Sequence, residues 1–432
     1  MLTGPIGKFV RKDYLSLIVW QLANYAMPLA LITYFSRVLG VKGFGIYGIA
    51  LGVLNACMVI TDWGFLYTSQ RALVEASGDI GREQEIIWET GTAKFLLAIL
   101  CSMALCIGAN GVGFHSPYAL PLLAGIPALF ASAVSQEWIL RGKEKFLAFA
   151  LSSVVGRAVS IPFAFLVVKT ADDAVWAIAS VSVGQLGASL LSVMLSDTRK
   201  YTVPRISILH ALTRIKDGLP LFIPIAAVNL FSVMLPPLIG LTSGPVEAGI
   251  YSGADRIRGA ARMLFYPLTV VAYPKINALR IKDPIALKSY LSKLIAIVFF
   301  GSAVVCGLIM LLAKSFIYVL LGHKFQDAIV VLQVLALSAF FSSLSNLLGT
   351  NVLVSFGMKR AFLQSQLIGI AIGGTAVLSL AVTHGALGGA AGVLLGEVAT
   401  LLGQVLSINR NMPWVFGRIA QRAGLRGYKS RR

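Results

Sequence analysis

The sequence has few charged side chains. Only 13% of its 432 residues are Asp, Glu, Lys or Arg, whereas a soluble globular protein carries about 25%. Hydrophobic residues make up 57% of the chain, and the mean hydropathy is +0.81. This composition excludes an ordinary soluble domain and predicts an integral membrane protein.

Acidic residues are scarcer than basic ones, with 18 Asp and Glu against 37 Lys and Arg, and the net charge is +19. In a soluble protein this excess would suggest a nucleic-acid partner. Here the basic residues fall in short gaps between apolar runs, without interleaved aromatic residues. We therefore expect membrane lipids with anionic headgroups as partners, and no nucleic acid.

Motifs for enzymatic chemistry are also lacking. The chain has no Walker A lysine motif, no clustered histidines and no recognisable nucleophile–base arrangement. Its four cysteines lie inside apolar runs, which argues against a disulfide framework. Residues 43–48 fit G-x-G-x-x-G, but no strand precedes them; we interpret Gly48, Gly52 and the glycines between Gly385 and Gly396 as helix-packing residues. We predict that the chain is not an enzyme and holds no metal or other cofactor.

Long apolar runs fill most of the chain. A helix needs about 20 apolar residues to cross the hydrocarbon layer. The predicted spans are 14–37, 44–68, 88–109, 118–140, 146–168, 173–195, 218–241, 247–274, 288–312, 327–354, 362–383 and 386–408. The predicted fold class is thus all-α, a polytopic membrane protein with about twelve transmembrane helices. The first run is too long for a signal-peptide core, so we expect it to be retained.

Lys and Arg are unevenly divided between the loops. The N-terminus, the C-terminal tail and the loops on their side carry 27 of the 37, and the opposite loops carry 5. Basic residues accumulate on the cytoplasmic side of a membrane protein. We therefore expect a multi-pass protein with both termini cytoplasmic.

A weak internal repeat divides the chain. Gly45-Ile-Tyr47 opens the second span and Gly249-Ile-Tyr251 opens the eighth. Six spans per half would give two lobes of equal orientation, related by a pseudo-two-fold axis along the membrane normal. The domains expected from this division are an N-terminal lobe at 1–195, a cytoplasmic linker at 196–216, a C-terminal lobe at 217–408 and a basic cytoplasmic tail at 409–432.

Charges inside spans are costly and point to function. The eighth span contains Asp255, Arg256, Arg258 and Arg262. From its outer end, Asp255 lies roughly 12 Å deep and Arg262 roughly 22 Å, so the charges bracket the midplane. We expect Asp255 to offset one arginine, Arg258 at i+3.

Arg258 and Arg262 share a helix face, where like charges repel unless an anion lies between them. Guanidinium groups match phosphate oxygens, so a phosphate-bearing ligand in a water-filled cavity is one interpretation. The other is a structural network that ties this helix to carboxylates elsewhere. Arg256 points to a different side of the helix and could belong to that network even if the other two arginines bind ligand.

Other charges lie in other spans. Arg157 and Glu397 fall near the midplanes of the fifth and twelfth spans, where each could line a cavity or pair with a neighbour. Asp62 and Glu137 lie near span ends, where we expect salt bridges at the rim. Lys94 is expected to extend its ammonium group to the cytoplasmic surface.

Five segments together carry a family resemblance. They are residues 36–47, 62–65, 244–255, 320–328 together with 331–335, and 344–349. With them, nearly the whole chain resembles the polysaccharide-exporting branch of the multidrug/oligosaccharidyl-lipid/polysaccharide flippase superfamily, the O-antigen-type lipid-linked oligosaccharide flippases. The peptidoglycan-precursor branch usually has fourteen spans and fits less well.

The resemblance implies a function in the bacterial inner membrane. Two six-helix lobes would surround a central cavity and, by alternating access, move an undecaprenyl-diphosphate-linked oligosaccharide to the outer leaflet for O-antigen or exopolysaccharide assembly. The polysaccharide polymerase machinery is a further candidate partner. Arg258, Arg262, Arg256 and Arg157 are candidate ligands of the diphosphate. Asp255 and Glu397 are candidates for charge pairing or for coupling to a H⁺ or Na⁺ gradient.

Two alternatives stay open. A drug/cation antiporter of the same superfamily would favour cavity carboxylates, whereas arginines outnumber buried carboxylates in the predicted spans. An integral-membrane polymerase or glycosyltransferase would usually expose a long catalytic segment, whereas the predicted outer loops have only about four to fifteen residues.

Overall fold

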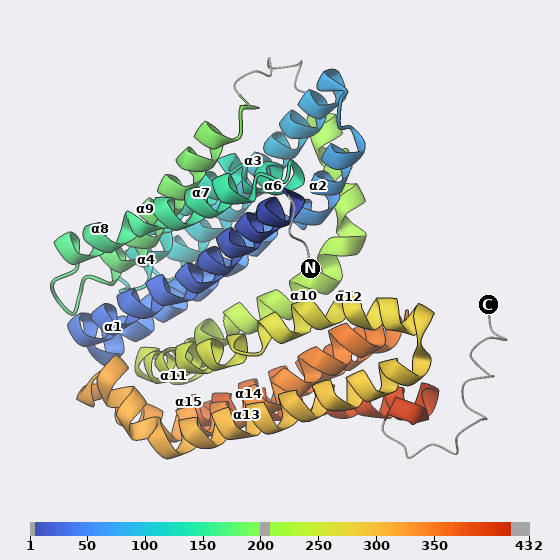
Figure 1. The fold of residues 1–432 in the computed structure, drawn as a ribbon. Coiled ribbons are helices and arrows are strands. Elements are labelled where there is room, and N and C mark those ends of the chain that lie inside the picture. The colour runs from blue at the N-terminus through green and yellow to red at the C-terminus, as the bar shows by residue number, and fades with distance from the viewer. Residues whose placement is uncertain (1–4, 199–207, 416–432) are drawn as a thin grey trace. The chain divides into compact units, whose positions relative to one another are not determined.

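The computed structural model describes residues 5–198 and 208–415, and these are almost entirely helical (Figure 1). The helices are α1 (Pro5–Asp62), α2 (Phe65–Glu75), α3 (Ile80–Gly111), α4 (Ala119–Ala124), α5 (Ile126–Val134), α6 (Glu137–Gly142), α7 (Phe146–Ala158), α8 (Ser160–Val167), α9 (Ala174–Leu195), α10 (Ile208–Ser243), α11 (Pro245–Met263), α12 (Tyr266–Lys282), α13 (Pro284–Leu320), α14 (Ala328–Asn346) and α15 (Lys359–Asn411). Short helical segments lie at His323–Phe325, Leu347–Val354 and Pro413–Val415. No strand occurs within the described ranges, so the all-α prediction is confirmed.

Nine helical stretches of the described residues are long and apolar enough to cross a membrane. Two of them, Met27–Glu75 and Lys359–Asn411, bend at the positive-φ residues Gly40 and Gly385 and correspond to two predicted spans each. The nine stretches therefore account for eleven of the twelve predicted spans. The twelfth, at 247–274, carries too many charges to qualify by hydropathy. The prediction of a polytopic membrane protein is confirmed.

Several predicted spans are interrupted helices. The fourth is divided among α4, α5 and α6, and the fifth between α7 and α8. The eighth is divided between α11 and α12, with Pro267 in the first turn of α12. Proline lacks the backbone N–H that an α-helix needs beyond its first turn, so it starts a new helix there.

The chain forms two compact units. Unit 1 comprises Met1–Ser252 with Leu320–Lys324, and unit 2 comprises Gly253–Val319 with Phe325–Arg432. Within unit 1, α10 packs on α1 and α3. The lobe boundaries expected from the sequence stay a prediction. Residues 199–207 of the expected linker and 416–432 of the expected tail lie outside the described residues, and α10 already begins at Ile208.

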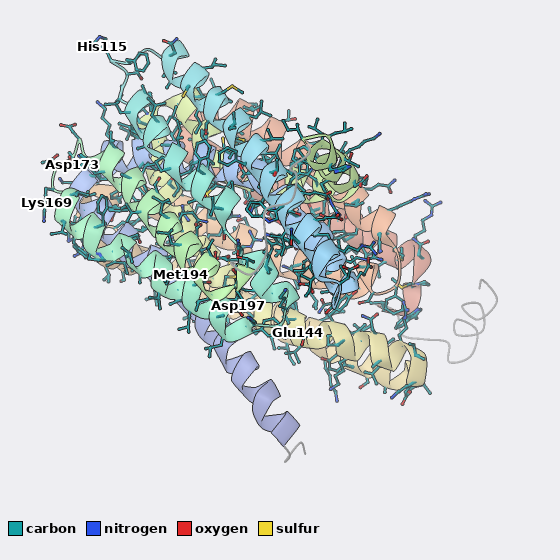
Figure 2. The ribbon with its side chains drawn as sticks, turned by 90° about the horizontal axis from the view of Figure 1, so that it is seen from above. His115, Glu144, Lys169, Asp173, Met194 and Asp197 are labelled. Carbon is teal, nitrogen blue, oxygen red and sulfur yellow. The ribbon has the colours of Figure 1, made fainter. Side chains whose placement is uncertain are left out.

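The loops of unit 1 gather at two ends. His115, Lys169 and Asp173 lie toward one end, and Glu144 and Asp197 toward the other (Figure 2). The ammonium group of Lys145 lies 2.5 Å from an Asp197 carboxylate oxygen, which joins the α6–α7 and post-α9 loops. Successive loops thus alternate between the two ends, as expected of helices that cross a membrane in turn.

Glycines permit the closest helix contacts, as the sequence predicts. In unit 1 the repeated motifs pack on each other, and a Cβ on Gly45 would lie 3.0 Å from the backbone nitrogen of Gly249. In unit 2 the chain turns back at Gly385, so that a Cβ on Gly392 would lie 2.5 Å from the nitrogen of Val377. Any larger side chain at these positions would separate the helices.

Unit 2 has its own apolar core. Leu291 and Val298 of α13 are buried against Ile276 of α12. Leu347 and Val352, of the π-helical segment Leu347–Val354, belong to the same core. In Figure 1, α14 and α15 run side by side in this unit. These contacts join α12, α13 and the segment Leu347–Val354 in one core.

Candidate functional site

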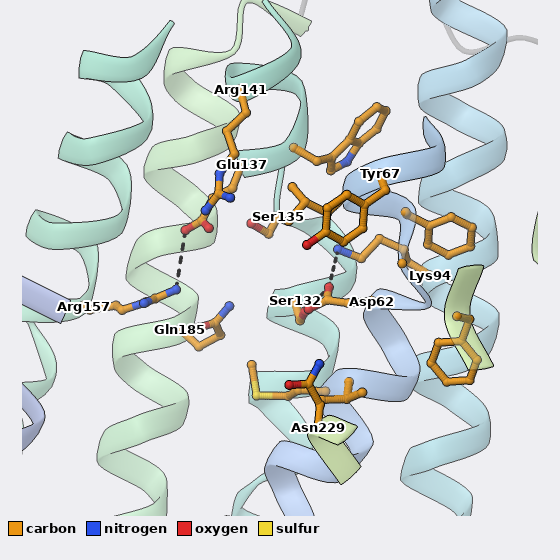
Figure 3. Close-up of a pocket in the computed structure, with 17 residues that line it drawn as sticks. Asp62, Tyr67, Lys94, Ser132, Ser135, Glu137, Arg141, Arg157, Gln185 and Asn229 are labelled. Carbon is orange, nitrogen blue, oxygen red and sulfur yellow. Dashed lines mark hydrogen bonds and ion pairs between the residues drawn. The ribbon is translucent and has the colours of Figure 1, made fainter. Parts of the chain in front are cut away.

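Unit 1 contains a cavity of about 340 Å³ with charged walls (Figure 3). Five charged residues line it, and we call it the charged cavity: Asp62, Lys94, Glu137, Arg141 and Arg157. Uncharged polar side chains share the wall: Tyr67, Ser132, Ser135, Gln185 and Asn229. Three cations face two carboxylates, which leaves an excess positive charge.

One side of the cavity is an ion pair between two helices. Lys94 of α3 is only 5% exposed, and its Nζ lies 3.0 Å from Oδ1 of Asp62 at the end of α1. The Ser132 hydroxyl of α5 donates to the same carboxylate oxygen at 3.2 Å. The prediction that Lys94 extends to the surface is therefore wrong, because a carboxylate within reach holds the ammonium group inside the unit.

The opposite side carries two arginines around one carboxylate. Nη2 of Arg157, from α7, lies 3.7 Å from Oε1 of Glu137 at the start of α6. The guanidinium of Arg141 lies 4.0 Å from the ring centre of Phe149, a cation–π contact that positions it. Glu137 lies between the two arginines in Figure 3. Its Oε1 is buried without a hydrogen-bond partner, so this pair is loose.

A break in the helix places Glu137. Residues Ser135 and Gln136 are non-helical and separate α5 from α6. The backbone N–H of Gln136 donates to the Ser192 hydroxyl of α9 at 2.9 Å, and its side-chain oxygen accepts from Thr198 at 2.5 Å. Unwound backbone at membrane depth requires such partners or a cavity to line. The break at Ser135 and Gln136 meets both conditions. Gln136 has the hydrogen-bond partners just named, and Ser135 and Glu137 face the cavity.

Helix α10 closes the cavity from a further side. Phe222 stacks on Trp63 with ring centres 3.9 Å apart and planes 15° apart. Nε1 of Trp63 donates to the carbonyl oxygen of Ile215 at 2.7 Å. Phe222 and Asn229 line the cavity. The packing of α10 against Trp63 requires a sharp turn after α1, where Trp63 and Gly64 both have positive φ.

In unit 2, Arg258 is enclosed. It is 4% exposed, and its Nη2 lies 2.6 Å from Oδ1 of Asp255 while Nε donates to the same oxygen at 2.7 Å. Nη1 also donates to the Ser338 hydroxyl of α14 at 3.4 Å. The predicted i+3 pairing is confirmed. Arg256, Arg262 and Glu397 are partly buried, and their assignment to a ligand or to coupling stays a prediction.

The structure therefore brings Arg157 together with residues that sequence reasoning placed at the rim. It also adds Arg141, which sequence reasoning missed. The available signal was its i+4 spacing from Glu137, which puts both on one helix face. Gln185 and Asn229 are polar residues inside predicted spans and could have been noted on that ground.

Comparisons with known proteins show the family to which the chain belongs. Residues 10–279, more than half of the chain, match the family model described as polysaccharide biosynthesis protein. A relative from Escherichia coli (strain K12), named as a candidate O-antigen transporter, is 28% identical over 82% of this chain and 85% of its own. A relative with the same description from Shigella dysenteriae is 24% identical over 91% and 98%.

Two solved structures share the fold. An inward-facing multidrug resistance MATE family transporter of the MOP superfamily has a TM-score of 0.68 at 16% identity, over 92% of this chain and 98% of its own. The lipid II flippase MurJ, in an inward closed conformation, has a TM-score of 0.65 at 14% identity, over 89% and 87%. At these identities the likeness concerns the fold alone. Together with the family match, it shows that this multi-pass membrane chain belongs to the polysaccharide biosynthesis protein family and has the fold of MOP-superfamily transporters.

Proposed function

We propose that the chain is a flippase that moves an undecaprenyl-diphosphate-linked oligosaccharide from the cytoplasmic to the outer leaflet by alternating access, for O-antigen or exopolysaccharide assembly. Membership of the polysaccharide biosynthesis family supports this proposal. So do relatives whose names refer to O-antigen transport. The charged cavity of unit 1 is the observation that carries it.

The cavity offers the two kinds of group that such a substrate needs. Lys94, Arg141 and Arg157 provide cationic donors for diphosphate oxygens. Gln185 and Asn229 provide amides that can hydrogen-bond sugar hydroxyls. Arg157 thereby becomes our leading diphosphate ligand, ahead of Arg258, because its carboxylate partner Glu137 lies 3.7 Å away whereas Asp255 lies 2.6 Å from Arg258.

A drug/cation antiporter is the second candidate, because MATE transporters share the fold. An organic cation would need a surplus of cavity carboxylates, whereas the charged cavity has a surplus of cations. The polymerase alternative has less support still, because the relatives' names refer to transport.

Reconstitution of the full chain into proteoliposomes tests the proposal. The probe is a fluorescent short-chain polyprenyl-diphosphate oligosaccharide, and its transfer between leaflets is followed by quenching. The matched probe carries one phosphate instead of two. We expect faster transfer of the diphosphate, because one charge-assisted contact fewer weakens binding about tenfold. No transfer of either probe, together with transfer of a cationic dye, would instead establish the antiporter.

Coupling to a H⁺ or Na⁺ gradient is part of the proposal. Of the two candidate carboxylates, Asp255 already forms an ion pair with Arg258 at 2.6 Å. Glu397 has no ion pair within the described residues, so it is the better candidate. Transfer rates with and without each imposed gradient test coupling, and equal rates would remove it.

The proposed setting is the bacterial inner membrane, with both termini cytoplasmic. The distribution of Lys and Arg supports this orientation. The polysaccharide polymerase machinery is the proposed partner on the outer side. Labelling of a cysteine introduced at Glu144 and of one introduced at Asp173 in whole cells tests the orientation. We expect the reagent to reach only position 173 from outside.

A further inference from the structure

Glu137 lies where an anionic ligand of Arg157 would bind. Its carboxylate points into the charged cavity between Arg157 and Arg141 (Figure 3). Its side chain is 19% exposed and that of Arg157 is 38% exposed. Both groups can therefore exchange partners without unfolding their surroundings.

The contact is poorer than two arginines and a carboxylate can make. A guanidinium normally meets a carboxylate oxygen at about 2.7–2.9 Å, whereas Nη2 of Arg157 and Oε1 of Glu137 are 3.7 Å apart. That oxygen is buried and accepts no hydrogen bond. In unit 2, by comparison, Arg258 and Asp255 meet at 2.6 Å. The contact between Arg157 and Glu137 is thus longer than a hydrogen-bonded ion pair.

The backbone around Glu137 permits displacement. The residue begins α6, which has six residues, directly after the non-helical Ser135 and Gln136. A side chain at this position can swing toward the open volume of about 340 Å³ without breaking an α-helical hydrogen bond.

We propose that Glu137 is an internal substitute for substrate: its carboxylate occupies the phosphate site in the empty protein, and the substrate diphosphate displaces it. The inference rests on the proposed function and adds a residue that lowers affinity. A diphosphate has more charge and more acceptor oxygens than a carboxylate, so it can engage both guanidinium forks at once. The displaced carboxylate prevents the site from holding substrate too tightly for release.

Binding of inorganic pyrophosphate to the purified full chain in nanodiscs tests this inference. Glu137→Gln removes the competing charge and keeps the side-chain shape, so we expect affinity to rise about fivefold. The matched control is Glu75→Gln. Glu75 also pairs with an arginine, Arg71 at 2.8 Å, but it is exposed on α2 outside the cavity. We expect the control to change affinity less than twofold.

A double substitution separates competition from a general charge effect. In an Arg157→Gln background the gain from Glu137→Gln should fall below twofold, because the phosphate site then lacks the arginine with which Glu137 forms its ion pair. A gain that persists there, or no gain in the single variant, overturns the inference. If Glu137→Gln does not fold, Glu137→Asp retracts the carboxylate and should raise affinity about twofold; an unchanged or lower affinity counts against the inference.

Two further comparisons identify the ligand and distinguish failure of the Glu137 role from failure of the phosphate site. Polyprenyl diphosphate in the nanodisc should show the same gain as pyrophosphate, and a gain with the free ion alone overturns the assignment to substrate. Loss of binding in Arg157→Gln without a gain in Glu137→Gln defeats only the substitute role. Equal pyrophosphate binding by the wild type and Arg157→Gln would defeat the phosphate site itself.

Discussion

The charged cavity of unit 1 and the Arg258–Asp255 pair of unit 2 place similar side chains in opposite conditions. Arg258 is 4% exposed, and Asp255 and Ser338 both accept from it. Arg157 is 38% exposed on its side chain, and its carboxylate partner is 3.7 Å away. An enclosed, satisfied pair contributes to structure, whereas a loose pair beside open volume can bind a ligand.

The largest expected effect separates these two roles. Asp255→Ala leaves the enclosed Arg258 guanidinium without its carboxylate, and breaking a buried pair costs about 3–5 kcal/mol. We expect a sharp loss of folded protein, measured by thermal unfolding in detergent. Asp255→Leu with Arg258→Met should recover most of that stability. Normal protein level with reduced surface glycan in Arg258→Ala would instead support a ligand role for Arg258.

The second effect concerns transport. Arg157→Gln should reduce flipping of the diphosphate substrate about tenfold, since one charge-assisted phosphate contact contributes about 1.5 kcal/mol. Protein level and thermal stability should stay near those of wild type, because the arginine is partly exposed and loosely paired. Arg71→Gln on the exposed face of α2 is the control. Equal losses in both variants would contradict a specific role.

A third test ranks three ion pairs by their coupling free energies. Double-mutant cycles should give a coupling of about 1 kcal/mol for Lys94–Asp62, below that of Arg258–Asp255 and above that of Arg157–Glu137. The reason is that Lys94 is buried while Asp62 is 55% exposed, so water weakens the attraction. Unfolding of wild type, Lys94→Met, Asp62→Asn and the double variant measures it. A Lys94–Asp62 coupling equal to that of Arg258–Asp255 would contradict the expected dependence of coupling on exposure to water.

The smallest effect is that of salt. Pyrophosphate binding in the charged cavity should weaken two- to threefold between about 50 and 150 mM NaCl, because partly exposed charges are screened. Thermal stability in detergent should change little over the same range, since the Arg258 side chain is only 5% exposed and its pair with Asp255 is screened less than a surface pair. Titrations at both salt concentrations provide the comparison, and salt-independent binding would place the anion elsewhere.

Local rules predicted part of this molecule. Apolar runs located the spans, and i+3 spacing paired Asp255 with Arg258. Helix-packing glycines such as Gly392 were also predicted. Such features depend on neighbours in the chain or on one helix face. The Lys94 prediction failed because its partner, Asp62, lies 32 positions away on another helix.

The amino-acid sequence by itself determined that this is an all-α membrane protein, because hydropathy and helix period act along the chain. Its motif segments in addition resemble a polysaccharide-exporting family. Only the tertiary structure decided which charged side chains are enclosed and which can contact a ligand in the cavity. The break at Ser135 and Gln136 and the turn at Trp63 bring Glu137, Asp62 and Lys94 to one cavity. Distances between helices are set by packing, and the free energy of a charge depends on those distances and on its access to water.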